Sequence, residues 1–152
     1  MNAHAVVVEE PHKLNVRELV LSEPTDNDLV VDIHWSGIST GTEKLLWSGR
    51  MPMFPGMGYP LVPGYESVGR VVKVGADSAL KVGQRVFVPG AKCYGEIKGL
   101  FGGAASRVIV DSNRVIAIQD HLGEEAILFA LAATGYHVTS GPGQEQPDLI
   151  IG

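Results

Sequence analysis

The chain has 152 residues, of which 12 are basic and 17 are acidic, so its formal net charge is −5 at neutral pH. The sequence has no block of Lys and Arg, which proteins that bind nucleic acid or anionic membranes need, and we expect no nucleic-acid partner. A hydrophobic content of 45% is enough to fill a core, while 19 glycines and nine prolines predict many turns.

The longest apolar stretch, at 126–133, is far shorter than the roughly 20 residues that cross a bilayer, so we expect no membrane span. No signal peptide is visible at the start of the sequence, and a single cysteine cannot form an internal disulfide. We therefore expect a folded protein of the cytoplasm.

Short β-branched runs separated by turn-forming residues dominate the first 120 positions. The runs predict strands at 5–8, 14–21, 29–38, 67–74, 85–88, 106–110 and 114–118. Asp111, Ser112 and Asn113 separate the last two runs and predict a hairpin turn between them. The pattern predicts an antiparallel β-barrel or sandwich.

Two helices and one long loop interrupt this pattern. Residues 42–47 predict a short helix with Gly49 as its C-cap. Residues 51–63 contain four prolines and three methionines, which favours a hydrophobic loop. A second helix is expected from Gly123, where acidic residues precede strong helix formers.

After a Gly/Pro turn at 140–147, residues 148–152 predict an apolar strand that reaches a glycine. A buried parallel strand needs neighbours on both edges and helices on its faces. We therefore expect this strand to open a βαβ nucleotide-binding unit and the chain to be the first part of a longer protein.

Four short motifs occur in a fixed order: GISTGTE at 37–43, PGYE at 63–66, VGQRV at 82–86 and ATGY at 133–136. In this order and spacing they resemble the medium-chain dehydrogenase/reductase superfamily. The resemblance implies a mainly β fold with a few helices, a GroES-like partly open β-barrel that forms the catalytic and substrate domain.

The same resemblance divides the chain into three parts. It implies a GroES-like substrate-binding domain at 1–122, a connecting helix at 123–139, and the start of a truncated Rossmann domain at 140–152. The missing Rossmann half would then be a partner of this domain, and the resemblance leaves room for a homo-oligomer.

A narrower likeness covers 39–52 and 54–66, which resemble a branch of the superfamily that acts in bacteriochlorophyll biosynthesis. That branch oxidises the 3-(1-hydroxyethyl) side chain of a bacteriochlorin to acetyl. The likeness implies a CH–OH dehydrogenase of a (bacterio)chlorophyllide that uses NAD. Three alternatives stay open: a zinc-free quinone or enone reductase, a polyol-type dehydrogenase, and a non-catalytic GroES-like binding module.

Zinc-dependent members of the superfamily hold their catalytic metal with Cys and His side chains. Thr40, Tyr65 and Ala130 stand at the places of those ligands, and Cys93 is the single cysteine where a structural zinc needs four. The resemblance therefore implies a zinc-independent enzyme, with no metal site.

Without a metal, the proton of the substrate hydroxyl must pass to a side chain or an ordered water. The resemblance places Thr42 where relatives start a proton relay, although Leu45 stands where many continue it with a His. Tyr65, Glu66 and Glu43 are the other acid/base candidates. Each has a structural alternative: a helix N-cap for Thr42, a volume filler for Tyr65, helix-dipole stabilisation for Glu43 and a buried ion pair for Glu66.

Aromatic and methionine side chains after the first helix suit a large flat substrate, because they stack on π-systems and adapt to their shape. The expected substrate-binding residues are Thr40, Trp47, Met51, Phe54, Met57 and Tyr59, with Phe101 as a second wall. These residues could instead pack against the missing half or a second subunit. The resemblance places cofactor contacts at Thr134 and Gly152.

Overall fold

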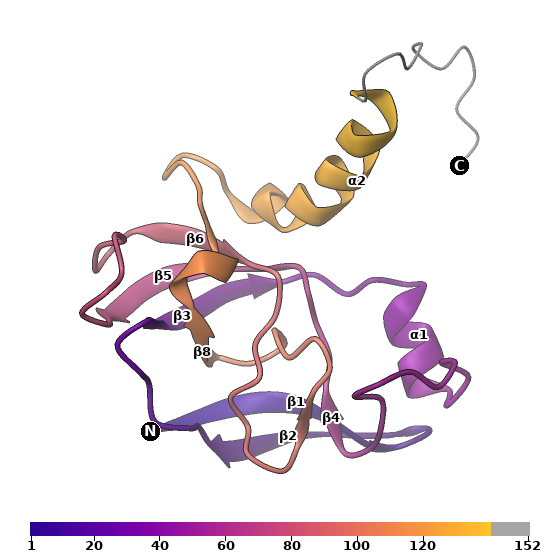
Figure 1. Cartoon of the computed structure of the whole chain (residues 1–152). Helices are drawn as coiled ribbons and strands as arrows, with labels where there is room; N and C mark the ends of the chain where they lie inside the picture. The colour runs from indigo at the N-terminus through magenta and orange to yellow at the C-terminus, as the bar shows by residue number, and fades with distance from the viewer. Residues whose placement is uncertain (141–152) are drawn as a thin grey trace.

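The computed structural model describes residues 1–140 (Figure 1). The strand predicted at 148–152, including Gly152, lies outside this range. The described elements are β1 (Asn2–Glu10), β2 (Lys13–Val20), β3 (Asp28–Ser36), α1 (Thr42–Trp47), β4 (Leu61–Val62), β5 (Ser67–Val74), β6 (Arg85–Val88), β7 (Lys98–Gly99), β8 (Arg107–Asp111), the 3₁₀ turn η1 (Ser112–Arg114), β9 (Ile116–Ala117), the 3₁₀ helix η2 (Glu124–Leu128) and α2 (Phe129–Thr139).

The strands form two sheets that face each other. One has the order β2-β1-β4-β7, and the other has the order β8-β3-β5-β6-β9. A single bridge between Ala5 and Ala105 connects the first sheet to the chain that leads into β8, so the two sheets do not close into a barrel. The expected mainly β, partly open architecture is confirmed.

The main core lies between the two sheets. Val7 of β1, Val31 of β3 and Val108 of β8 are completely buried in it. These side chains belong to the β-branched runs of the sequence, where alternate residues point to the same face of a sheet. Burial of this apolar surface is the main force that holds the sheets together.

A second, smaller core fixes α1 to the first sheet. It contains Val8, Leu46, Leu61 and Leu100. Gly49 follows α1 with a φ of 70°, so it ends the helix in the left-handed conformation that its sequence predicts. The buried Leu46 thereby sets the position of Thr42 at the other end of α1.

The hairpin predicted at 106–118 is wrong. β8 pairs with β3 and β9 pairs with β6, at opposite edges of the same sheet. The Asp111 side chain does accept a hydrogen bond from the backbone N of Asn113 at 2.8 Å, as the turn sequence suggests. However, the chain continues into η1 instead of reversing, so the two strands diverge.

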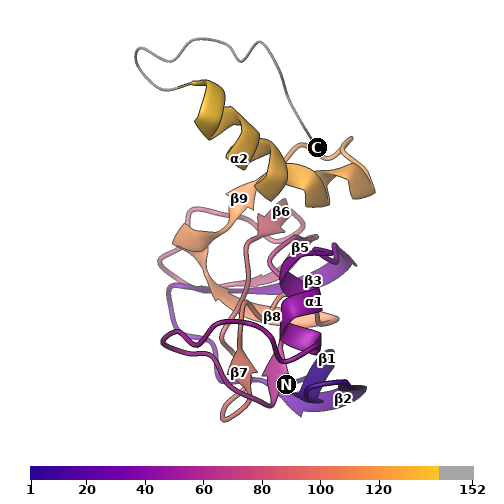
Figure 2. The same cartoon turned by 90° about the vertical axis from the view of Figure 1, so that its right-hand side faces the viewer.

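The second helix begins differently from the expectation. Its first segment is the 3₁₀ helix η2, and the α-helical part starts only at Phe129. Arg85 of β6 donates a hydrogen bond to the carbonyl oxygen of Gly123 at 2.8 Å and fixes this start to the sheet. α2 has no buried residue in the described part of the chain, and Figure 2 shows it extending beyond β6 and β9.

Candidate active site

Two hydroxyl groups meet where α1 faces the segment before β5. The Oγ1 atom of Thr42 and the phenol oxygen of Tyr65 are 3.2 Å apart, a hydrogen bond in which either can donate. The N-cap of α1 is Gly41, which makes no side-chain cap bond, so Thr42 is the first helical residue and not the cap. Its hydroxyl is therefore available to Tyr65.

A glycine and an aromatic ring hold Tyr65 in place. Gly64 has a φ of 99°, and a Cβ atom there would lie 2.7 Å from the backbone N of Ala104. Only glycine permits this close approach without displacing the chain. The ring of Tyr65 then meets Phe101 edge to face, with centroids 5.1 Å apart. The structure thus brings together Thr42, Tyr65 and Phe101 from three distant segments.

The two acidic candidates lie next to these hydroxyl groups in the sequence and are shielded from water to different degrees. Glu66 is 5% exposed and Glu43 is partly buried. Burial raises the pKa of both carboxyls, and the Glu66 charge raises the pKa of Glu43 further. One oxygen of each, Oε2 of Glu43 and Oε1 of Glu66, has no hydrogen-bond partner among the described residues.

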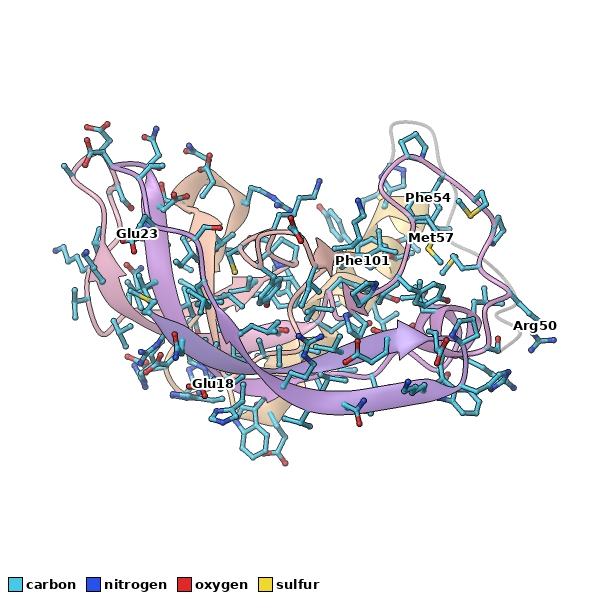
Figure 3. All side chains as sticks on the ribbon, turned by 90° about the horizontal axis from the view of Figure 1, so that it is seen from below. Glu18, Glu23, Arg50, Phe54, Met57 and Phe101 are labelled. Carbon is cyan, nitrogen blue, oxygen red and sulfur yellow. The ribbon has the colours of Figure 1, made fainter. Side chains whose placement is uncertain are left out.

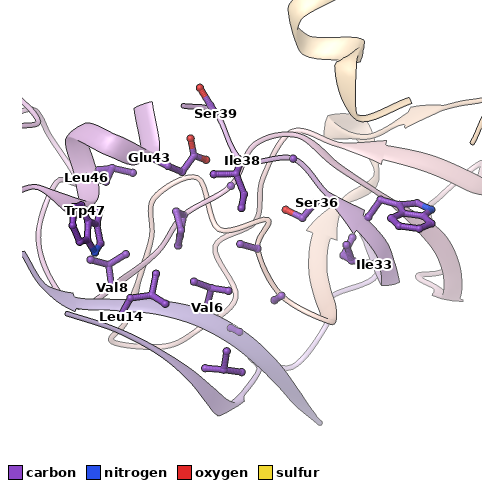
Figure 4. A pocket seen from close by; sticks show the side chains of 18 of the residues that line it. Val6, Val8, Leu14, Ile33, Ser36, Ile38, Ser39, Glu43, Leu46 and Trp47 are labelled. Carbon is purple, nitrogen blue, oxygen red and sulfur yellow. The ribbon is translucent and has the colours of Figure 1, made fainter. Parts of the chain in front are cut away.

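An apolar groove of about 700 Å³ lies on the other side of the segment 37–40 (Figure 4). Thr40, Glu43 and Trp47 are among the residues that line it, whereas Tyr65, Glu66 and Phe101 do not line it. Sequence reasoning did not find this groove. The sequence feature that could have indicated the groove is the alternation of the apolar residues Leu14 and Val16 on β2, which stay exposed in the folded chain.

The hydrophobic loop after α1 is divided between the core and the surface. Met51, Met57 and Tyr59 pack against the second core, and the Tyr59 hydroxyl donates a hydrogen bond to the carbonyl oxygen of Leu46. Phe54 is 38% exposed. Figure 3 shows Phe54 and Met57 on this loop, with Arg50 near its start directed outward.

Trp47 at the end of α1 is 45% exposed. Its ring packs edge to face against His12, with centroids 4.5 Å apart. The expected substrate residues of α1 and the loop divide into exposed and packed side chains. Within the loop and α1, the exposed aromatic faces are those of Trp47 and Phe54, and the other expected aromatic and methionine side chains support the loop from within.

Of the two residues expected to contact the cofactor, the structure describes only Thr134. Thr134 is exposed on α2, and its hydroxyl donates to the carbonyl oxygen of Ala130 at 3.0 Å. Gly152 lies outside the described residues. Within 1–140, no cluster of three or more His, Cys, Asp or Glu side chains could hold a metal ion.

Cys93 is buried, and its Sγ accepts a hydrogen bond from the backbone N of Ile109 at 3.4 Å. Burial raises the pKa of its thiol. None of the helices described for residues 1–140 has the length and hydropathy to cross a membrane.

Residues 25–120 match the alcohol dehydrogenase GroES-like domain. The chain is 49% identical over 153 residues to 2-desacetyl-2-hydroxyethyl bacteriochlorophyllide A dehydrogenase of Rhodobacter capsulatus, a match that covers 100% of this chain and 49% of that protein. It is 48% identical over 157 residues to the protein of the same name from Cereibacter sphaeroides, again covering 100% of this chain and 49% of the relative. The chain therefore spans about half the length of these relatives.

The fold is also found in a solved dehydrogenase. The crystal structure of 2R,3R-butanediol dehydrogenase from Bacillus subtilis superimposes with a TM-score of 0.75 at 22% identity, covering 94% of this chain and 48% of that one. This likeness shows the fold alone. With the domain match over more than half of its length, the chain belongs to the alcohol dehydrogenase GroES-like domain family of the medium-chain dehydrogenase/reductase superfamily.

Proposed function

We propose that this chain is the substrate-binding part of a zinc-independent, NAD-dependent dehydrogenase that oxidises the 3-(1-hydroxyethyl) group of a (bacterio)chlorophyllide to acetyl. The observation that carries the proposal is the 49% identity to the Rhodobacter capsulatus relative, because it extends over the whole chain. The hydroxyl pair of Thr42 and Tyr65 supports it as a place for a substrate oxygen.

Oxidation of a secondary alcohol removes a hydride from carbon and a proton from oxygen. A bound nicotinamide supplies the hydride acceptor, and we assign its contacts in this chain to Thr134 and Gly152. Thr42 and Tyr65 each present a hydroxyl that can donate to or accept from the same substrate oxygen. Their role is to orient that oxygen and to take up its proton, with Glu43 and Glu66 as the acid/base groups beside them.

The zinc-independent part of the proposal rests on the chemistry of the side chains. Thr40 and Tyr65 carry oxygen donors where zinc sites of this superfamily use sulfur and nitrogen, and Ala130 carries no donor atom. A phenol in that place can hold a substrate oxygen by a hydrogen bond without a metal. Positioning of the alcohol then falls to the hydroxyl pair.

The proposed pigment surface consists of the partly exposed rings of Trp47, Phe54 and Phe101. In our proposal the surface also includes Thr40, together with Met51, Met57 and Tyr59, which pack against the second core and support the loop from below. A macrocycle that buries about 300 Å² against this surface would gain ~7 kcal/mol before ordering costs. Taken alone, that gain corresponds to a dissociation constant of about 10 μM, and ordering costs weaken the binding further.

A chimera tests the proposed reaction. The first half of the Rhodobacter capsulatus relative is replaced by this chain, and acetyl formation from 3-hydroxyethyl bacteriochlorophyllide is measured with NAD. The same exchange with the first half of the Cereibacter sphaeroides relative controls for the new interface between halves. We expect both chimeras to oxidise the pigment. Activity of the control alone would contradict the proposal.

A further inference from the structure

The turn between β1 and β2, formed by Pro11 and His12, packs against the end of α1 at two places. The backbone N of His12 donates a hydrogen bond to the carbonyl oxygen of Trp47 at 2.8 Å. A Cβ atom on Gly49 would lie 2.6 Å from Cγ of Pro11, so the proline packs directly against this glycine. The turn therefore covers the end of α1, where helix carbonyl groups lack partners within the helix.

His12 also contacts the side chain of the residue whose backbone it holds. Its imidazole meets the indole of Trp47 edge to face, with ring centroids 4.5 Å apart and an angle of 84° between the ring planes. Aromatic pairs of this geometry are favoured beyond the area that they bury. Trp47 nevertheless stays 45% exposed. The contact with His12 thus leaves a large part of the indole open to a ligand.

The backbone conformation at position 12 does not by itself require a ring there. His12 has a φ of 66° and is the only residue other than glycine with a positive φ within 1–140. Glycine adopts this left-handed conformation most easily, and asparagine also tolerates it well. Either would keep the turn and the backbone hydrogen bond to Trp47, but neither has a ring to place against the indole. What histidine adds at this position is therefore the contact with Trp47.

The indole of Trp47 lies outside the second core that fixes α1. That core contains Leu46, the preceding residue, at complete burial. Trp47 instead lines the apolar groove together with Val8 and Leu14, and Figure 4 shows its ring directed from α1 toward the strands that carry them. An exposed side chain at such a place can change rotamer unless a neighbour holds it. His12 is the residue whose ring is placed to do so.

We propose that His12 is a positioning residue for substrate binding: its ring holds the Trp47 indole in the orientation on which a flat macrocycle stacks. A side chain that is fixed before binding loses less conformational freedom when the ligand arrives, so the ligand binds more tightly without touching His12. The role in binding rests on the proposed function, because Trp47 belongs to the proposed pigment surface. The hold of His12 on Trp47 does not depend on pigment.

Time-resolved fluorescence anisotropy without pigment tests this hold. Trp35→Phe leaves Trp47 as the single tryptophan of the chain. In that background, His12→Asn and His12→Gly both suit the left-handed turn but lack the ring. Each should increase the fast local motion of the indole and its quenching by acrylamide. His137→Asn, at an exposed position of α2, should change neither. An indole that stays equally immobile in both His12 variants would overturn the positioning role.

A double-mutant cycle on pigment affinity tests whether His12 acts through Trp47. Titration of the chain with a chlorophyllide-type pigment, followed by pigment absorption, should show binding about 2- to 10-fold weaker in His12→Asn. In the Trp47→Ala background the same substitution should have no further effect, because the side chain that it positions is gone. An equal loss in both backgrounds, or no loss in either, would contradict the proposal.

The two measurements separate this inference from the proposed function. If the unchanged chain binds no pigment, the proposed pigment surface fails, and the role of His12 in binding fails with it. The anisotropy result then still decides whether His12 holds Trp47. If pigment binds and Trp47→Ala weakens it while His12→Asn does not, the surface stands and the positioning role of His12 is wrong.

Discussion

At the scale of single residues, Tyr65 combines two separable contacts. Its hydroxyl bonds to Thr42, and its ring packs against Phe101. Tyr65→Phe removes the first contact and keeps the second. In the active chimera we therefore expect kcat to fall by about 100-fold or more, with little change in the KM for pigment.

Steady-state kinetics measure this effect, and Tyr136→Phe is the matched control because that ring is exposed on α2. If Tyr65→Phe keeps full kcat, the hydroxyl takes no part in the reaction, and Tyr65 only fills the space at this position.

Glu66 predicts a pH dependence of stability. Burial raises the pKa of its carboxyl above the ordinary value of 4.5, so the folded chain binds its proton more tightly than the unfolded chain does. The contribution of this group to stability is therefore full below pH 4.5 and is lost as the pH rises through the raised pKa. Glu66→Gln, which carries no charge, should remove this loss.

Urea denaturation at about pH 5 and about pH 8 measures the difference between the variant and the unchanged chain. Glu66→Gln should gain free energy of unfolding relative to the unchanged chain at the higher pH. An equal difference at both pH values would mean that the burial of this carboxyl does not depend on its protonation.

At the scale of elements, the Leu46 side chain anchors α1 in the second core. Leu46 is completely buried between Val8 and Leu61, and α1 has only six residues, too few to be stable by themselves. Leu46→Ala should cost about 2–5 kcal/mol in the free energy of unfolding. Leu131→Ala, at a residue of α2 that is 55% exposed, should cost far less.

Chemical denaturation of both variants checks this prediction. If the two substitutions have similar costs, α1 is not held by its buried leucine, and the position of Thr42 would need another explanation.

The strands at 29–38, 67–74 and 85–88 could be predicted, because local β-branched runs and turn residues mark them. Which strands pair with one another in the sheet could not be predicted, since pairing depends on contacts between distant residues. The turn at Asp111 to Asn113 shows why a hairpin was predicted wrongly. The side chain of Asp111 makes the expected turn hydrogen bond, but β8 pairs with β3 and β9 pairs with β6. Thr42 and Tyr65 were single candidates through a resemblance, and their contact was found only in the structure, because nothing local indicates that they meet.

The groove was beyond sequence reasoning for the same reason. Glu43 and Glu66 were candidates as single residues, and the different burial of their side chains was found only in the structure. The loop at 51–63 was recognised by its prolines and methionines. Which of its side chains point inward became clear only from the position of the second core.

At the scale of the whole molecule, the chemistry of the site predicts no bound zinc. Thr40, Tyr65 and Ala130 offer no sulfur or nitrogen ligand, and Cys93 is buried next to β8. Elemental analysis after mild dialysis should find less than stoichiometric zinc. One zinc per chain would contradict the zinc-independent assignment.

Pigment binding by the chain itself tests the central claim most directly. Titration with a chlorophyllide-type pigment should quench tryptophan fluorescence in a saturable way and shift the pigment absorption band. Trp47→Ala and Phe54→Ala should each weaken binding by ~1–3 kcal/mol, roughly 5-fold to 150-fold. Tyr136→Ala is the control, because the Tyr136 ring is exposed on α2 and does not line the groove, whereas Trp35 lines the same groove as Trp47. Absence of saturable binding, or equal binding by all three variants and the unchanged chain, would contradict a pigment surface formed by α1 and the loop after it.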